Sequence, residues 1–506
     1  MHLEISGRLL SRNAWLNFVS QAGPLLVAVA TIPFIVKGLG VERFGLLSIA
    51  WIAPEFFTFI DLGLGRAITK YVAVALGKGD RDRVCGLVWT AMTFQAVLGC
   101  FGSLVLIGMT TFLTEQLLNI PAALEPEAKD LFRLTALSIP LVLVSTSLTG
   151  LLGAGQRFDL LSSVNATFHI TNIVITLVGV LIFNWGLPEI AAFVLAARFV
   201  VLLAYYRLCI YVYSFFRKPR FYFSGLPNLL AFGGWVTVSG VVVPALLYMD
   251  RFVIGASMTM AAVAYYSIPF EIVARLWIVP TSLAATLFPA LSMLSGQQEQ
   301  VQRLSSLLCG SMKWMILILG AAVLMITAFA HDILELWLGS SFAQESALVL
   351  QILAVGILIN SAVQVQYAFL QALGRPDLTA KFHLIQLPLH GLVLWCLVSS
   401  WGIPGAALAQ SIRLSVEALL LLFGTCHLTS LSFHWLRSEK IVQTFLLLLF
   451  VAVFTIAISK LPLVMWLRLV GLGIVFCAVG RAVWRYSLNR QDRDHLLEFF
   501  WPASAR

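Results

Sequence analysis

Charged side chains are scarce in this chain of 506 residues. Only 11% of the residues are Asp, Glu, Lys or Arg, whereas 60% are hydrophobic and the mean hydropathy is +0.92. A water-soluble domain carries about 25% charged residues. The composition therefore excludes a soluble globular protein and indicates a chain that folds in a lipid bilayer.

Motifs that bind metals or nucleotides are also lacking. The seven cysteines are scattered through apolar segments and form no CxxC pair, which favours buried small hydrophobic residues over a metal site or a disulfide framework. No GxxxxGKS or GxxxxGKT loop is present, and Gly77-Lys78-Gly79-Asp80 lacks its spacing, which disfavours an ATP-driven pump. We therefore expect neither a metal nor another cofactor.

The N-terminus lacks the pattern of a cleavable signal peptide. Met1–Trp15 is polar and is interrupted by Arg8 and Arg12, so the first apolar segment is expected to insert as its own anchor. A helix that crosses a bilayer needs about 20 residues, and fourteen apolar stretches of roughly that length follow one another. These predicted spans are residues 13–36, 44–65, 84–110, 132–152, 162–183, 190–213, 229–256, 262–294, 307–329, 347–372, 382–400, 405–427, 441–459 and 462–482.

The positive charges assign an orientation to these spans. With the N-terminus in the cytoplasm, 23 Lys and Arg residues fall in cytoplasmic segments, seven fall in outer segments and three lie inside spans. Lys and Arg concentrate in the cytoplasmic loops of membrane proteins. Both termini are therefore predicted to be cytoplasmic, and the net charge of +9 reflects topology rather than nucleic-acid binding.

The two halves of the chain repeat each other at an offset of about 219 residues. The loop 155–160 parallels 374–378, and Trp-Gly-x-Pro occurs at both 185–188 and 401–404. Six spans in each half make a parallel repeat, which is typical of transporters with a site between the halves; the alternative is that apolar segments resemble one another by composition alone. The predicted domains are an N-terminal six-helix lobe (1–218), a C-terminal six-helix lobe (219–432), and two extra spans with a basic cytoplasmic tail (433–506).

Several short motifs, in their order and spacing, match those of a known transporter family. The first half contains Asn17, Pro33-Phe34-Ile35, Leu39-Gly40, Phe44-Gly45-Leu46, Asp61-Leu62-Gly63-Leu64-Gly65-Arg66-Ala67 and Thr69-Lys70. The second half contains Asp250-Arg251-Phe252-Val253-Ile254-Gly255 and Ala264-Tyr265-Tyr266. These runs resemble the O-antigen and exopolysaccharide flippases of the multidrug/oligosaccharidyl-lipid/polysaccharide exporter superfamily.

The resemblance implies an all-α polytopic membrane protein, a V-shaped bundle of two six-helix lobes like that of the MATE transporters, working by alternating access. It implies that an undecaprenyl-pyrophosphate-linked oligosaccharide moves from the cytoplasmic to the periplasmic leaflet of a bacterial inner membrane. It also makes a polysaccharide polymerase and the chain-length machinery candidate partners, besides the membrane lipids.

Ionisable residues deep in a span cost about 2.5–3.5 kcal/mol on insertion scales, so each needs a reason. Glu55 follows Pro54 in the second span, and the repeat offset places it within a residue of Arg275 in the eighth. We expect Arg275 to attract the substrate pyrophosphate and Glu55 or Glu271 to take a coupling ion. Alternatively Glu271 and Arg275, four residues apart, neutralise each other.

Further candidates lie at the ends of spans. Asp61 is a third candidate for ion coupling, and Arg66 and Lys70 are candidates for gathering a diphosphate headgroup, although positive-inside anchoring explains the two cations equally well. Glycines 63 and 65 would permit a loosened helix or a close helix contact. Asp250 and Arg251 form either an outer gate or an interfacial pair.

Two more arginines lie inside spans at nearly equivalent places of the repeat. Arg413 has Glu417 at i+4 and is expected to be partly neutralised. Arg198 has no acid within one turn, which makes it the better candidate for an anionic substrate, because Arg holds phosphate oxygens bidentately.

Two other functions remain open. A cation-coupled multidrug antiporter of the same superfamily would share the architecture, but the intramembrane arginines would repel cationic drugs. A membrane-embedded glycosyltransferase or ligase commonly needs acids or His on a sizeable outer loop, and the largest outer loop, residues 111–130, carries no paired His or Asp cluster.

Overall fold

A computed structural model of the chain describes residues 7–56, 61, 63–222, 226–284, 287 and 301–429, with nine isolated positions beyond residue 440. This part consists of helices and turns without a β-strand, so the predicted all-α fold is confirmed. Eight helices within it are long and apolar enough to cross a bilayer, and the protein is a multi-pass membrane protein. The two predicted spans 441–459 and 462–482 fall almost wholly outside the described residues, and the total of fourteen stays a prediction.

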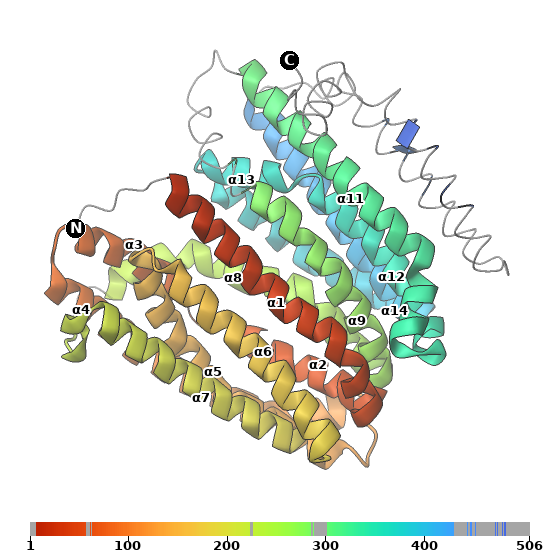
Figure 1. The fold of residues 1–506 in the computed structure, drawn as a ribbon, viewed down its shortest axis with the longest axis horizontal. Helices are drawn as coiled ribbons and strands as arrows, with labels where there is room; N and C mark the ends of the chain where they lie inside the picture. Colours follow the sequence, from red (N-terminus) through yellow and green to blue (C-terminus); the bar gives the residue numbers. More distant parts are fainter. Residues whose placement is uncertain are drawn as a thin grey trace, which may run out of the picture. The chain divides into compact units, whose positions relative to one another are not determined.

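Packing divides the chain into two compact units, residues 1–267 and 268–506. In the first unit α5 lies against α3, α4 and α7, α1 packs on α6, and α8 contacts α2 and α3 (Figure 1). The boundaries of the two six-helix lobes at residues 218 and 432 stay predictions. The helices of the first unit are α1 (Gly7–Leu39), α2 (Val41–Phe56), α3 (Leu64–Gly77), α4 (Arg81–Phe112), α5 (Glu125–Ala154), α6 (Phe158–Ile182), α7 (Leu187–Val212), α8 (Leu226–Ser257) and α9 (Met260–Ala274), which runs on into the second unit.

The second unit continues from α9 through a short 3₁₀ turn, Arg275–Trp277. Within this unit α12 packs on both α11 and α14. Its further helices are α11 (Val301–Leu338), α12 (Ser340–Ser361), α13 (Gln364–Ala372) and α14 (Pro376–Thr429). The predicted spans 382–400 and 405–427 both belong to α14, which bends at Gly402 (φ 63°, ψ −140°).

The second predicted span, 44–65, is not one regular helix. Its described part consists of α2, of Asp61 and Gly63, and of the start of α3 at Leu64. Gly63 has φ 69°, a left-handed backbone that ends a regular helix and that glycine adopts without steric cost. Asp61 lies in this break rather than inside a helix.

The repeated loop motifs form the same turn in both halves. Gln156 (φ 57°) and Gly374 (φ 71°) are both left-handed, and the next residue of each, Arg157 or Arg375, donates from its backbone N–H to a leucine carbonyl five residues earlier. Each arginine then contacts the aspartate two residues ahead at 3.0 Å. Because this carboxylate stabilises the charged guanidinium, the pKa of Arg157 is raised above its ordinary value.

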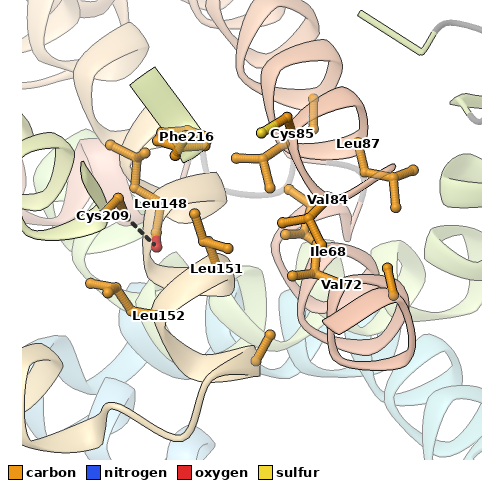
Figure 2. Close-up of a cluster of buried hydrophobic side chains, with 14 of the residues drawn as sticks. Ile68, Val72, Val84, Cys85, Leu87, Leu148, Leu151, Leu152, Cys209 and Phe216 are labelled. Atoms are coloured by element: carbon orange, nitrogen blue, oxygen red, sulfur yellow. Dashed lines mark hydrogen bonds between the residues drawn. The ribbon is translucent and has the colours of Figure 1, made fainter. Parts of the chain in front are cut away.

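A buried apolar cluster joins α3, α4, α5 and α7 (Figure 2). Cys209 belongs to it, and its thiol points to the backbone carbonyl of Leu148 at 3.6 Å. Cys85, Cys309 and Cys426 are buried too, as small hydrophobic residues should be. The same expectation was wrong for Cys100 and Cys396, which are exposed.

Candidate functional site

Arg198 of α7 borders a small cavity inside the first unit. The cavity lies between α2, α5 and α7 and has a volume of about 20 Å³, room for about one water molecule. Apolar side chains make most of its wall, with Thr135 and Ser138 of α5 as neighbours of Arg198. A sugar does not fit in this cavity as it stands, whereas a water molecule or a small anion does.

Two further groups define the surroundings of Arg198. Its guanidinium lies over the ring of Phe168 at 5.1 Å from the centroid, an attractive cation–π geometry that leaves the charge in place. Trp51 of α2 lines the same cavity, and its indole Nε1 is buried without a hydrogen-bond partner. An indole N–H and a guanidinium are both donors, so two of the residues that line this cavity carry hydrogen-bond donors.

Asp61 is the centre of a polar network between α3, α4 and α5. Its Oδ2 accepts a hydrogen bond from the backbone N–H of Gly65 at 3.1 Å, which caps the start of α3. Its Oδ1 accepts from the hydroxyl of Thr146 at 3.0 Å and from the amide of Gln95, whose Oε1 in turn accepts from Ser147. The network ties the break after α2 to two neighbouring helices.

The two glycines of this motif have different tasks. Gly63 loosens the chain at the helix break, through its positive φ. Gly65 lies close to α5: a Cβ added to it would lie 3.3 Å from Cβ of Thr146, and a Cβ added to the facing Gly150 would lie 2.8 Å from the Gly65 carbonyl oxygen. The loosened helix is found at Gly63 and a close helix contact at Gly65.

Asp250 and Arg251 are fully buried, with 0% and 1% of their surface exposed. Asp250 accepts a hydrogen bond from the hydroxyl of Tyr266, and Nε of Arg251 donates to Ser267 at 3.1 Å. The guanidinium of Arg251 also lies 5.2 Å from the ring of Tyr248. These contacts link α8 to α9, so the pair lies within the protein and not on an exposed interface; a gating role stays a prediction.

In the second unit Glu271 and Arg275 contact each other at 3.4 Å, with nearly half of each side chain exposed. This is the mutual neutralisation that the i, i+4 spacing allowed. Arg413 likewise contacts Glu417 at 3.3 Å, but with only 4% of its side chain exposed. Both pairs are the local ion pairs that the i, i+4 spacing allowed, as the alternative to a free charge for the substrate.

For the remaining predicted residues the structure describes fewer contacts. Lys70 of α3 is exposed, with its ammonium 5.7 Å from the ring of Tyr71. The side chains of Glu55 and Arg66 lie outside the described residues, although their backbones belong to α2 and α3. Their proposed roles in ion coupling and headgroup binding stay predictions.

Sequence reasoning did not single out four polar residues that are buried or partly buried. Gln95 and Thr146 bind Asp61, and His383 and Gln386 lie on the buried side of α14. The available signal was their position, because each is a polar residue well inside an apolar stretch. Which neighbours they meet depends on helix packing and is not visible in the sequence.

The sequence of the chain is similar to those of polysaccharide biosynthesis and transport proteins. The family model described as "Polysaccharide biosynthesis protein" matches residues 10–295. The chain is 26% identical over 423 residues to a Shigella flexneri protein named "Putative O-antigen transporter", a match that covers 82% of this chain and 96% of the relative. It is 29% identical over 204 residues to a "Probable low-salt glycan biosynthesis flippase" of Haloferax volcanii, covering 40% of this chain and 42% of that one.

Solved structures show the same fold at low sequence identity. An inward-facing multidrug resistance MATE family transporter of the MOP superfamily matches with a TM-score of 0.70 and 16% identity, over 82% of this chain and 98% of that chain. A MOP superfamily transporter from Pyrococcus furiosus matches with a TM-score of 0.61 and 14% identity, over 84% and 95%. The predicted MATE-like fold class is confirmed by these similarities.

Proposed function

Because the chain belongs to the polysaccharide biosynthesis protein family, we propose that it is a flippase for a lipid-linked oligosaccharide. The relative that covers most of the chain is named as an O-antigen transporter, and a second is named as a glycan biosynthesis flippase. In finer detail, the substrate is an undecaprenyl-pyrophosphate-linked oligosaccharide that moves from the cytoplasmic to the periplasmic leaflet by alternating access.

The observation that carries the proposal is the position of Arg198. This cation lies inside a predicted span, half-buried, at a cavity that Trp51 also lines, and the buried indole N–H of Trp51 has no hydrogen-bond partner. Donors of this kind suit the phosphate oxygens of a pyrophosphate linkage. In the proposal the cavity is the place where the first unit contacts the headgroup when the site opens.

The other untested roles follow from this proposal. Arg66 and Lys70 add positive charge along the path of the diphosphate, and Asp61, Glu55 or Glu271 takes a coupling ion. Arg275 and Arg413 are already paired with Glu271 and Glu417, so either would contribute to the path only after its pair opens. Both termini lie in the cytoplasm of a bacterium, and the protein acts in the inner membrane as a transporter without catalysis, supplying a polysaccharide polymerase on the other side.

The test is complementation of a strain that lacks the gene. Arg198→Ala is expected to reduce surface polysaccharide to background while the protein remains in the membrane, and Arg198→Lys is expected to retain part of the export because it keeps the charge. Arg133→Ala is the matched control, since Arg133 is an exposed arginine paired with Asp130 on α5. Normal surface polysaccharide in the Arg198→Ala strain would refute the role of this cation, and loss of drug resistance without loss of glycan would favour the antiporter.

A further inference from the structure

A second buried polar cluster lies in the second unit, on the two arms of α14. We define the α14 cluster as His383, Gln386, Gln410, Arg413 and Glu417, all with little exposed surface. His383 and Glu417 are 34 residues apart, which would be about 50 Å along a straight helix. They nevertheless lie 3.3 Å apart, because the bend at Gly402 turns the second arm back along the first.

The exposure of the side chains on both arms indicates that the α14 cluster faces the protein interior. In the middle of the first arm large apolar residues are exposed, among them Ile385, Leu389 and Leu392. On the second arm Leu419 and Phe423 are exposed in the same way. Polar residues in membrane helices face the protein interior or a water-filled cavity, so the α14 cluster lies on the faces of the two arms that lipid does not cover.

Glu417 connects the two ends of a charged triad. One of its carboxylate oxygens accepts from Arg413 at 3.3 Å, and the other contacts Nε2 of His383 at 3.3 Å. Nε of Arg413 also donates to Gln410 at 2.9 Å. Since the arginine balances the glutamate, the triad has no net charge while the imidazole is neutral.

One basic atom of this triad, Nδ1 of His383, is available to accept a proton. An imidazole nitrogen facing a carboxylate carries the hydrogen, which assigns the proton to Nε2 and leaves Nδ1 of His383 as a lone-pair acceptor. Nδ1 is buried and has no hydrogen-bond partner. Gln386, one helical turn away, is buried with both amide atoms unpartnered, so it offers a carbonyl oxygen to an N–H formed at Nδ1.

We propose that the His383–Glu417–Arg413 triad is a proton-binding site, in which Nδ1 of His383 takes up a proton from water and the carboxylate of Glu417 holds the resulting imidazolium. Proton uptake changes the triad from zero to one positive charge and breaks no bond. The proposed proton binding is argued from the geometry of the triad alone. The further statement that this proton drives transport rests on the proposed flippase function.

Other ionisable groups lie on α11, α12, α13 and α14. From α13 the ring of Tyr367 lies 6.4 Å from the imidazole of His383. Buried Lys313 belongs to α11, and α12 contributes Glu345, which is exposed. On α14 itself His390 is buried two turns beyond His383. In the proposal the imidazole of His383 is the group that takes up the proton, because its Nδ1 is buried and has no hydrogen-bond partner.

The binding test is histidine NMR on the purified full-length protein in lipid nanodiscs, with ¹⁵N-labelled imidazoles. The chain has eight histidines, and His383→Gln and His383→Asn each identify one resonance by its loss. In the wild type we expect this resonance to change from that of a neutral imidazole to that of an imidazolium as the pH is lowered. Glu417→Gln should weaken or abolish this change, because it removes the carboxylate that holds the imidazolium.

His331→Gln is the matched control, since His331 forms an exposed His–Glu pair with Glu335 at 3.5 Å. It should remove another resonance and leave the titration of His383 unchanged. A His383 imidazole that stays neutral from pH 5 to 8, or that titrates identically in Glu417→Gln, would overturn the proton site.

The use of the proton is tested in cells. His383→Gln is expected to lower surface polysaccharide to background at normal protein levels, and His331→Gln is expected to have no effect. Wild-type export by His383→Gln would overturn the coupling role. If the wild-type chain itself exports no glycan while His383 titrates as expected, the flippase proposal fails and the proton site stands.

Discussion

Gly45 of α2 allows the closest helix approach in the Phe44-Gly45-Leu46 motif, and Gly45→Ala tests it. A Cβ built on Gly45 would lie 1.9 Å from the carbonyl oxygen of Met260 and 2.7 Å from its carbonyl carbon. Non-bonded heavy atoms favour about 3.5–4.0 Å. The overlap therefore falls on backbone at the start of α9, which cannot rotate away as a side chain would.

The magnitude follows from a matched pair of variants. Overpacking of a close-packed site costs about 1–3 kcal/mol, while Ala gains up to about 1 kcal/mol over Gly inside a helix. Gly108 of α4 has no atom within 4 Å of a built Cβ, so Gly108→Ala has only the second effect. The difference between the two variants thus isolates the steric cost, about 1–3 kcal/mol.

The assay measures the apparent unfolding temperature of the detergent-purified protein. Samples are heated, and the protein that remains folded is quantified by size-exclusion chromatography. With an unfolding entropy of about 2.1 cal/mol/K per residue, each kcal/mol shifts the unfolding temperature of a chain of 506 residues by about 1 °C, so Gly45→Ala should unfold roughly 1–3 °C below Gly108→Ala. Equal unfolding temperatures for the two variants would refute the reasoning, because they would mean that α2 and α9 do not approach as closely as described.

Two further outcomes are expected by the same assay. Asp61→Ala removes the acceptor of the Gly65 N–H and one acceptor each of Thr146 and Gln95, which keep Leu143 and Thr146 as second acceptors, and should lower stability by about 1–3 kcal/mol; Asp61→Asn keeps one acceptor oxygen and should lose less, and equal losses would contradict the capping role. Gly402→Ala places a side chain at φ 63° and ψ −140° and should cost about 1–3 kcal/mol in backbone strain. Gly310→Ala, with open space around the built Cβ, serves as its control, and an unfolding temperature as high as that of the control would argue against a required bend.

The membrane class and the helical fold were predictable because both follow from local composition. A run of about 20 apolar residues has no other stable form in a bilayer than a helix, so the order of spans could be read directly. The motif-based resemblance to polysaccharide flippases is confirmed by the family match over residues 10–295. The repeated loops were predictable for a similar reason, since the Arg-x-Asp contact joins residues two positions apart.

The candidate site was predictable only residue by residue. The pairings of Arg275 with Glu271 and of Arg413 with Glu417 follow from i, i+4 spacing. The contact of Glu417 with His383 and those of Asp61 with Gln95 and Thr146 each join segments more than 30 residues apart. No local pattern encodes which helices meet, so these partners were not foreseen.

By itself, then, the sequence determined that this protein crosses a membrane many times, which turns repeat, and which few charges lie inside the spans, because hydropathy, spacing and turn chemistry act over short stretches of chain. Only the tertiary structure decided that the second span breaks at Gly63, that α14 folds back at Gly402, and which buried groups face one another. The physical reason is that backbone direction at a single glycine and the packing of distant helices depend on contacts that the apolar composition of a span leaves open.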